Sequence, residues 1–112
     1  MKLNHVNLTV TDVKAAQTFL QTYFGLTVAG ERGDSFAALL DDDGSVLTLM
    51  KGSQVSYPKT FHIGFVQESE EKVNEIHRRL KNDGFTVAPP KRAHGWTFYV
   101  AAPGGFTVEV LA

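Results

Sequence analysis

Three side chains in this sequence have the chemistry of ligands for a divalent transition metal: His5, His62 and Glu109. Neutral imidazole nitrogens and carboxylate oxygens bind Fe²⁺, Mn²⁺, Zn²⁺ and Ni²⁺. Two imidazoles and one carboxylate on rigid strands would hold such an ion from one side and leave positions open for water, substrate or dioxygen. The set therefore predicts a catalytic metal centre rather than a purely structural one.

An internal repeat places the two histidines at equivalent positions. Residues 3–10 and 60–67 alternate between apolar and polar side chains, which predicts two half-buried strands. His5 and His62 lie on the polar face of their strands, opposite faces made of Val, Leu, Ile and Phe. If helices cover the apolar faces, both imidazoles point toward whatever the other face encloses.

An amphipathic helical pattern follows each of these strands. Val73 follows Ala16 by the same number of residues as His62 follows His5. Ala16 and Val73 each begin a stripe of apolar residues with helical spacing. Thr11 or Asp12 can cap the first helix and Ser69 the second. Gly25 and Gly84 follow the helices, where a residue without Cβ readily ends a helix.

The residues after these glycines read Leu-Thr-Val at 26–28 and Phe-Thr-Val at 85–87, and each half of the chain then supplies two more strand candidates, residues 35–40 and 46–50 in the first and 96–101 and 106–111 in the second. The order β-α-β-β-β in both halves predicts an α+β fold with two βαβββ modules forming a curved mixed sheet around a cavity. We expect one domain over residues 1–112, with modules of about 1–52 and 60–112. Each module is too small to bury its sheet alone, so it must pack against the other module or a second chain.

The predicted last strand carries Glu109 on the face opposite an apolar one. A carboxylate in so apolar a strand needs a partner, because unpaired burial is expensive. That partner is either a metal ion or, in the simpler alternative, a Lys or Arg side chain. The counterpart of Glu109 in the first half is Thr48, whose hydroxyl is a poor metal ligand, so three protein ligands are predicted.

Two further residues are candidates for catalysis. His94 is an acid/base candidate because imidazole titrates near neutral pH, with an unconstrained surface loop as the alternative. Tyr99 shares a strand face with Thr97 and could donate to a bound oxyanion, with ordinary packing as the alternative. Lys91 and Arg92 could hold a carboxylate or phosphate, or lie solvated.

The composition narrows the classes of function. Eleven Lys and Arg residues stand against twelve Asp and Glu, with no dense basic face, so nucleic acid is not an expected partner. The chain has no cysteine, so any metal must be held by nitrogen and oxygen. No segment has the length or apolar character of a signal peptide or membrane span, and we expect a cytoplasmic protein that does not engage membranes.

Three segments resemble the vicinal oxygen chelate superfamily, which includes glyoxalase I, extradiol dioxygenases, fosfomycin-modifying enzymes and bleomycin-binding proteins. They are HVNLTV at residues 5–10, FHIGF at residues 61–65 and FYVAAPGGFTVEV at residues 98–110. The resemblance spans nearly the whole chain and implies that the family's metal ligands fall on His5, His62 and Glu109. It also implies a small-molecule substrate chelated through vicinal oxygens, and a homodimer.

The sequence departs from some relatives within this resemblance. Glyoxalase I has a fourth ligand where this chain has Thr48, so the three-ligand pattern is more similar to extradiol dioxygenases and fosfomycin-modifying enzymes. We therefore expect a metal-dependent enzyme of dioxygenase-like or glyoxalase/lyase-like type. The alternatives are a metal-free protein that sequesters an antibiotic of the bleomycin type, and a degenerate partner domain of a larger complex.

Overall fold

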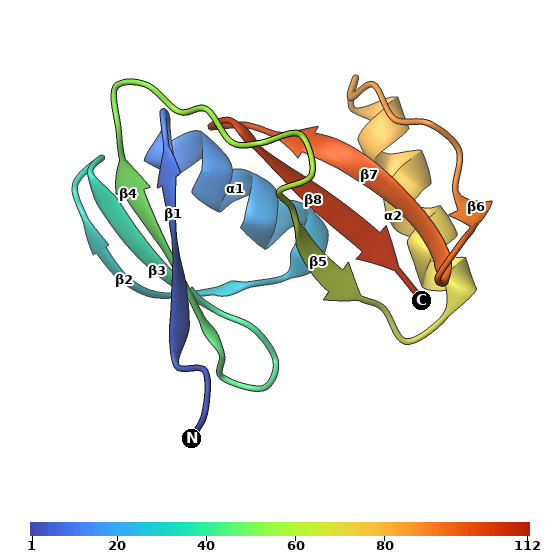
Figure 1. Ribbon diagram of the computed structural model, residues 1–112, viewed down its shortest axis with the longest axis horizontal. Coiled ribbons are helices and arrows are strands. Elements are labelled where there is room, and N and C mark those ends of the chain that lie inside the picture. Colours follow the sequence, from blue (N-terminus) through green and yellow to red (C-terminus); the bar gives the residue numbers. More distant parts are fainter. The chain divides into compact units, whose positions relative to one another are not determined.

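The computed structural model describes all residues 1–112 and has the predicted α+β architecture (Figure 1). The chain divides into two compact units, the first comprising residues 1–57 and 103–105, the second residues 58–102 and 106–112. Each contains one helix and one four-stranded mixed sheet. The two-module α+β fold predicted from the repeat is thus confirmed, whereas the assignment of residues 1–112 to one domain stays a prediction.

The first unit has the strand order β1-β4-β3-β2. Its strands are β1 (His5–Val10), β2 (Thr27–Arg32), β3 (Phe36–Leu40) and β4 (Val46–Lys51), and its helix is α1 (Val13–Phe24). β1 runs parallel to β4, while the other two pairs are antiparallel. Helix α1 packs on β3 and β4 through its apolar stripe.

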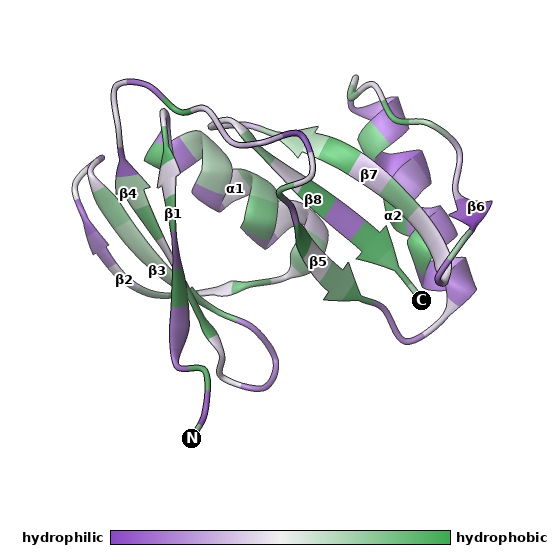
Figure 2. Cartoon of the chain, viewed as in Figure 1, coloured by the Kyte–Doolittle hydropathy of each residue, from purple (hydrophilic) through white to green (hydrophobic).

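The second unit repeats this topology with the order β5-β8-β7-β6. Its strands are β5 (Ile63–Val66), β6 (Lys91–Arg92), β7 (Trp96–Ala102) and β8 (Phe106–Leu111), and its helix is α2 (Glu70–Asn82). β5 runs parallel to β8, and α2 packs on β7 and β8. Figure 2 shows β8 as a hydrophobic strand interrupted by a hydrophilic band, in keeping with the single charged residue, Glu109, among its apolar neighbours.

The helix ends follow the sequence signals. Asp12 caps α1 by accepting a 3.0 Å hydrogen bond from the Ala15 amide, and Ser69 caps α2 by accepting one of 3.1 Å from Lys72. Gly25 ends α1 with a φ of 66°, the left-handed conformation that a residue without Cβ adopts without strain. Neither helix is long and apolar enough to cross a membrane.

The two strands expected over residues 3–10 and 60–67 are shorter in the structure, where they are β1 and β5. β5 begins at Ile63, so His62 lies in the segment just before it rather than within it. β6 covers only two residues, Lys91 and Arg92. The preceding Pro89 and Pro90 explain the short β6, because proline has no amide hydrogen to donate to a neighbouring strand.

Candidate active site around Glu109

The carboxylate of Glu109 lies buried in β8 and is bound by three side chains of the second unit. Oε2 is 2.6 Å from the Thr97 hydroxyl and 2.5 Å from Nε2 of His94. Oε1 is 3.3 Å from Nε2 of His62. Since the ionic partners of Glu109 are these two imidazoles alone, the alternative in which Lys or Arg neutralises it does not occur.

These contacts also set the acidity of Glu109. Burial raises the pKa of its carboxyl group, but hydrogen bonds from Thr97 and His94, the charge of His94 and a contribution from the Tyr99 hydroxyl outweigh that effect. The net result is a pKa below the ordinary value for glutamate. Glu109 is therefore ionised at neutral pH, as a metal-binding carboxylate must be.

The ring of His62 is held in one tautomer by the backbone. Its Nδ1 lies 2.9 Å from the carbonyl oxygen of Thr60, and a carbonyl oxygen can only accept, so Nδ1 carries the proton. In the neutral ring, Nε2 is then an acceptor directed at Oε1 of Glu109. Nε2 of His62 and Oε1 of Glu109 are then two acceptors 3.3 Å apart, which repel each other unless a positive charge lies between or beside them. That charge is either a proton on Nε2 or a metal ion.

His5 lies at the start of β1 in the first unit, where its Nδ1 also has a nearby hydrogen-bond acceptor. Nδ1 is 2.9 Å from Oδ1 of Asn4, so donation through Nδ1 leaves Nε2 available for a ligand. The role of His5 as a ligand of the same ion as His62 and Glu109 stays a prediction.

The strand register agrees with the repeat that made Thr48 the counterpart of Glu109. In the parallel pairs, Asn7 faces Thr48 as Gly64 faces Glu109. The Thr48 hydroxyl donates a 2.7 Å hydrogen bond to Oδ1 of Asn7. Gly64 lies beside the carboxylate, since a Cβ at this position would be in ordinary van der Waals contact with Oε1 of Glu109, at 3.8 Å.

His94 is held in place by its neighbours instead of lying in an unconstrained loop. Arg92 forms a 2.8 Å ion pair with Glu70 of α2 and lies 5.2 Å from the centre of the Trp96 ring. The Trp96 indole in turn donates a 2.8 Å hydrogen bond to Asn74 of α2. These contacts fix both ends of the short loop that directs His94 at Glu109, and they commit the Arg92 guanidinium to Glu70 rather than to a ligand.

Tyr99 lies directly across from Glu109 in the pairing of β7 with β8. Its ring meets that of His62 edge-on, with 5.3 Å between ring centres. Burial, followed by the negative charge of Glu109, raises the pKa of the Tyr99 hydroxyl. The hydroxyl is accordingly a proton donor at neutral pH.

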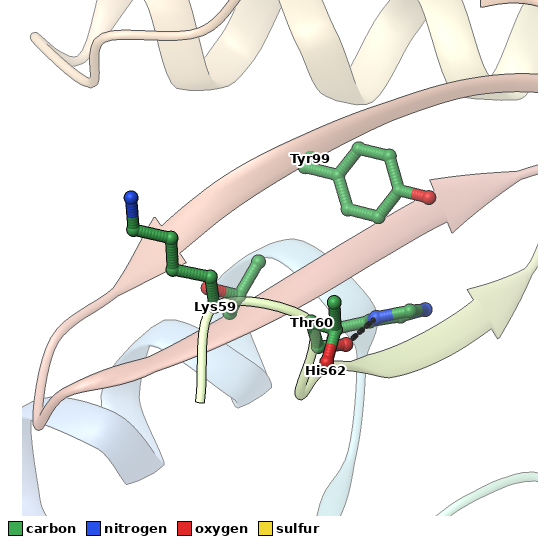
Figure 3. A pocket seen from close by; sticks show the side chains of 5 residues that line it. Lys59, Thr60, His62 and Tyr99 are labelled. Carbon is green, nitrogen blue, oxygen red and sulfur yellow. Dashed lines mark hydrogen bonds between the residues drawn. The ribbon is translucent and has the colours of Figure 1, made fainter. Parts of the chain in front are cut away.

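An open pocket of about 410 Å³ lies beside these two rings. It is lined by Lys59, Thr60, His62, Tyr99 and Thr107. Figure 3 shows Lys59, Thr60 and His62 on the segment that leads into β5, with Tyr99 across from them on β7. The pocket gives a small molecule access to the imidazole that contacts Glu109.

The donors around Glu109 fit a divalent transition metal by their chemistry, although the structure contains no group of three or more His, Cys, Asp or Glu side chains arranged to hold one. His62 and Glu109 supply one imidazole nitrogen and one ionised oxygen, side by side. A third donor has to come from elsewhere, and His5 is the residue that the repeat indicates.

Sequence reasoning missed the roles of Thr97, Lys59, Thr60 and Thr107. Thr97 had one signal, because it shares the strand face of Tyr99 two residues away. No pattern in the sequence identifies the three pocket residues, since Lys59 and Thr60 lie in the linker before β5 and Thr107 is an ordinary strand residue.

A family model described as the Glyoxalase/Bleomycin resistance protein/Dioxygenase superfamily matches residues 2–110. The chain belongs to this superfamily. The resemblance seen in the sequence motifs is thus confirmed over nearly the whole chain.

Solved structures of this superfamily resemble the chain closely. A possible glyoxalase from Bacillus cereus is 62% identical with a TM-score of 0.97, and the match covers 100% of this chain and 99% of that one. The fosfomycin resistance protein FosX of Listeria monocytogenes, in complex with Mn(II) and 1S,2S-dihydroxypropylphosphonic acid, is 26% identical with a TM-score of 0.84. That match covers 99% of this chain and 91% of FosX.

A curated relative in Bacillus subtilis is described as a probable trivalent organoarsenical cleaving enzyme. It is 29% identical over 85 residues, which make up 76% of this chain. The match spans only 58% of the length of that relative.

Proposed function

We propose that this superfamily member is a metal-dependent enzyme in which His5, His62 and Glu109 hold one divalent ion that binds a small substrate through two adjacent oxygens. The observation that carries the proposal is the pair formed by the acceptor nitrogen of His62 and the buried, ionised Glu109. The Mn(II) complex of FosX supports it, because that relative uses a divalent ion on the same fold.

When bound, such an ion supplies Lewis-acid chemistry to the two substrate oxygens. The residues around it have separate tasks. Thr97 and His94 hold Oε2 of Glu109, which leaves Oε1 for the ion. Tyr99, kept protonated by its surroundings, donates a hydrogen bond to an oxyanion of the substrate, and His94 is the acid/base candidate at the edge of the site.

The donor set favours a dioxygenase-like reaction over a glyoxalase-like isomerisation or lyase reaction. Thr48 occupies the place of a fourth ligand, and its hydroxyl is already bonded to Asn7. Three protein ligands leave more positions open for substrate oxygens and dioxygen. We do not propose cleavage of a trivalent organoarsenical. Trivalent arsenic is a soft centre that prefers thiolate ligands, and none of the 112 residues is a cysteine.

Metal titration tests the proposal. The purified chain is loaded with Mn²⁺ or, without oxygen, with Fe²⁺, and the bound ion is measured by electron paramagnetic resonance and elemental analysis. We expect one ion per chain in the wild type and loss of at least tenfold in affinity in His5→Ala, His62→Ala and Glu109→Gln, because each removes one of three ligands.

His77→Gln provides the matched control. His77 lies on α2 and contacts Phe98, so its replacement removes an imidazole without touching the proposed ligands. It should bind metal as the wild type does. A wild-type chain that binds none of these ions, yet takes up an apolar antibiotic of the bleomycin type, would instead be a sequestering protein.

The proposal includes a homodimer. The first and last strands of each sheet order are edges, and β1 and β5 are two of them. Val6 on β1 and Val66 on β5 are exposed apolar residues on these edges, which a second chain could cover. Light scattering should give twice the chain mass, and Val66→Lys should lower the share of dimer. A monomeric wild type would contradict this part of the proposal.

A further inference from the structure

The pocket beside His62 and Tyr99 has a single lysine or arginine in its wall, Lys59. Lys59 takes part in none of the ion pairs of the structure, unlike Lys14, Lys51 and Lys72. No carboxylate lines the pocket. The pocket therefore combines one uncompensated positive charge with an opening to solvent.

The remaining polar groups of the wall are hydrogen-bond donors. Thr60 and Thr107 each present a hydroxyl for which the structure shows no partner, since the contact of Thr60 with His62 uses its backbone carbonyl. Tyr99, which also lines the pocket, adds a third hydroxyl. An ammonium and three hydroxyls within one pocket favour a ligand with several acceptor oxygens and a negative charge.

The other basic residues near this site are not placed to do the same. Arg92 is committed to Glu70, and Lys91 does not line the pocket. Lys59 is thus the cation that a ligand bound against His62 and Tyr99 would meet.

We propose that this pocket recognises an oxyanion group of the substrate, a carboxylate or a phosphonate, with Lys59 as its counter-charge and the Thr60 and Thr107 hydroxyls as hydrogen-bond donors. Its assignment as the substrate pocket rests on the proposed function, while the capacity to bind the anion does not require a metal. The substrate class is accordingly a small oxyacid.

Anion titration of the intact, metal-free chain tests the proposal. Methylphosphonate and, in a separate series, acetate are added to ¹⁵N-labelled protein, and amide shifts are followed. We expect saturable shifts centred on Lys59, Thr60 and Thr107. The tighter of the two probes identifies whether a phosphonate or a carboxylate is preferred.

Lys59→Met should weaken anion binding about tenfold, because it removes one charge-assisted hydrogen bond while keeping the apolar stem. Lys59→Arg should restore most of it. Lys81→Met is the matched control, since Lys81 lies on α2 in the same unit, forms no ion pair of the structure and does not line the pocket.

Unchanged affinity in Lys59→Met, or shifts that map to the Lys81 face, would overturn the proposal. Titration of the same variants with Mn²⁺ separates this result from the proposed function. Loss of anion binding in Lys59→Met with normal metal binding supports both proposals. If the wild type binds methylphosphonate through Lys59 but binds no metal, the oxyanion pocket is supported and the proposed metal-dependent function is refuted.

Discussion

The hydroxyl of Thr97 donates a 2.6 Å hydrogen bond to Oε2 of Glu109 across the β7–β8 pair. The same oxygen also meets Nε2 of His94, whereas Oε1 faces His62. The two oxygens of one carboxylate are thus held in different surroundings. One oxygen is held by Thr97 and His94, and the other lies against the imidazole of His62.

Thr97→Val tests the contribution of this hydrogen bond to the fold and the site. Valine keeps the shape of threonine but leaves a buried, ionised acceptor with one donor fewer, so we expect a loss of about 1–3 kcal/mol in the free energy of unfolding at neutral pH. Urea denaturation measures it. Thr18→Val, at an exposed position of α1, is the control and should change stability by about 0.5 kcal/mol or less. Equal losses in both variants would show that the hydrogen bond contributes nothing specific.

His94→Gln should move the pKa of Glu109 upward. His94 lowers that pKa through its hydrogen bond and its charge, and glutamine retains at most the hydrogen bond. The carboxyl carbon of Glu109, followed by ¹³C NMR in metal-free protein, reports the titration directly. Because the pKa of Glu109 is lowered in the wild type, its carboxyl group stays ionised at a pH at which an ordinary glutamate is protonated. In the variant, Glu109 should become protonated at a higher pH than in the wild type. An unchanged or lower pKa of Glu109 in His94→Gln would contradict the contact between His94 and Glu109.

Thr48→Glu tests the repeat at the position opposite Asn7. If the proposed metal centre exists, a second carboxylate at the place equivalent to Glu109 should raise the affinity for Mn²⁺ by about tenfold, since it adds an ionised oxygen ligand. Calorimetric titration gives the affinity. Thr18→Glu carries the same added charge on α1 and should leave it unchanged. An equal rise in both variants would mean that charge alone, and no ligand, explains the gain.

Ser69→Ala should destabilise the second unit by about 1 kcal/mol, because Ser69 caps α2 by accepting from the Lys72 amide. α2 also holds Glu70 and Asn74, which fix the loop carrying His94. Hydrogen exchange should therefore quicken at the start of α2 in Ser69→Ala. Ser56→Ala, in the exposed linker, is the comparison, and no difference between the two variants would argue against the cap.

The sequence by itself determined the local elements and the equivalence of the two modules. Alternation around His5 and the helical stripe starting at Ala16 reappear around His62 and at Val73, and Asp12, Ser69 and Gly25 stand where the helices begin or end. Such features depend on neighbouring residues and on the burial of one face of a helix or strand. Both can be predicted from the order of residues in the sequence. The sequence also identifies His5, His62 and Glu109 as candidate metal ligands, through their imidazole and carboxylate groups.

The tertiary structure alone decided which side chains meet Glu109. Thr97 and His94 reach it because the register of β7 and β8 and the anchoring of Arg92 to Glu70 place them there. The shortness of β6 and the gathering of Lys59 with Thr107 likewise follow from packing between distant segments. Contacts of this kind depend on register and loop path, which the identities of neighbouring residues do not specify.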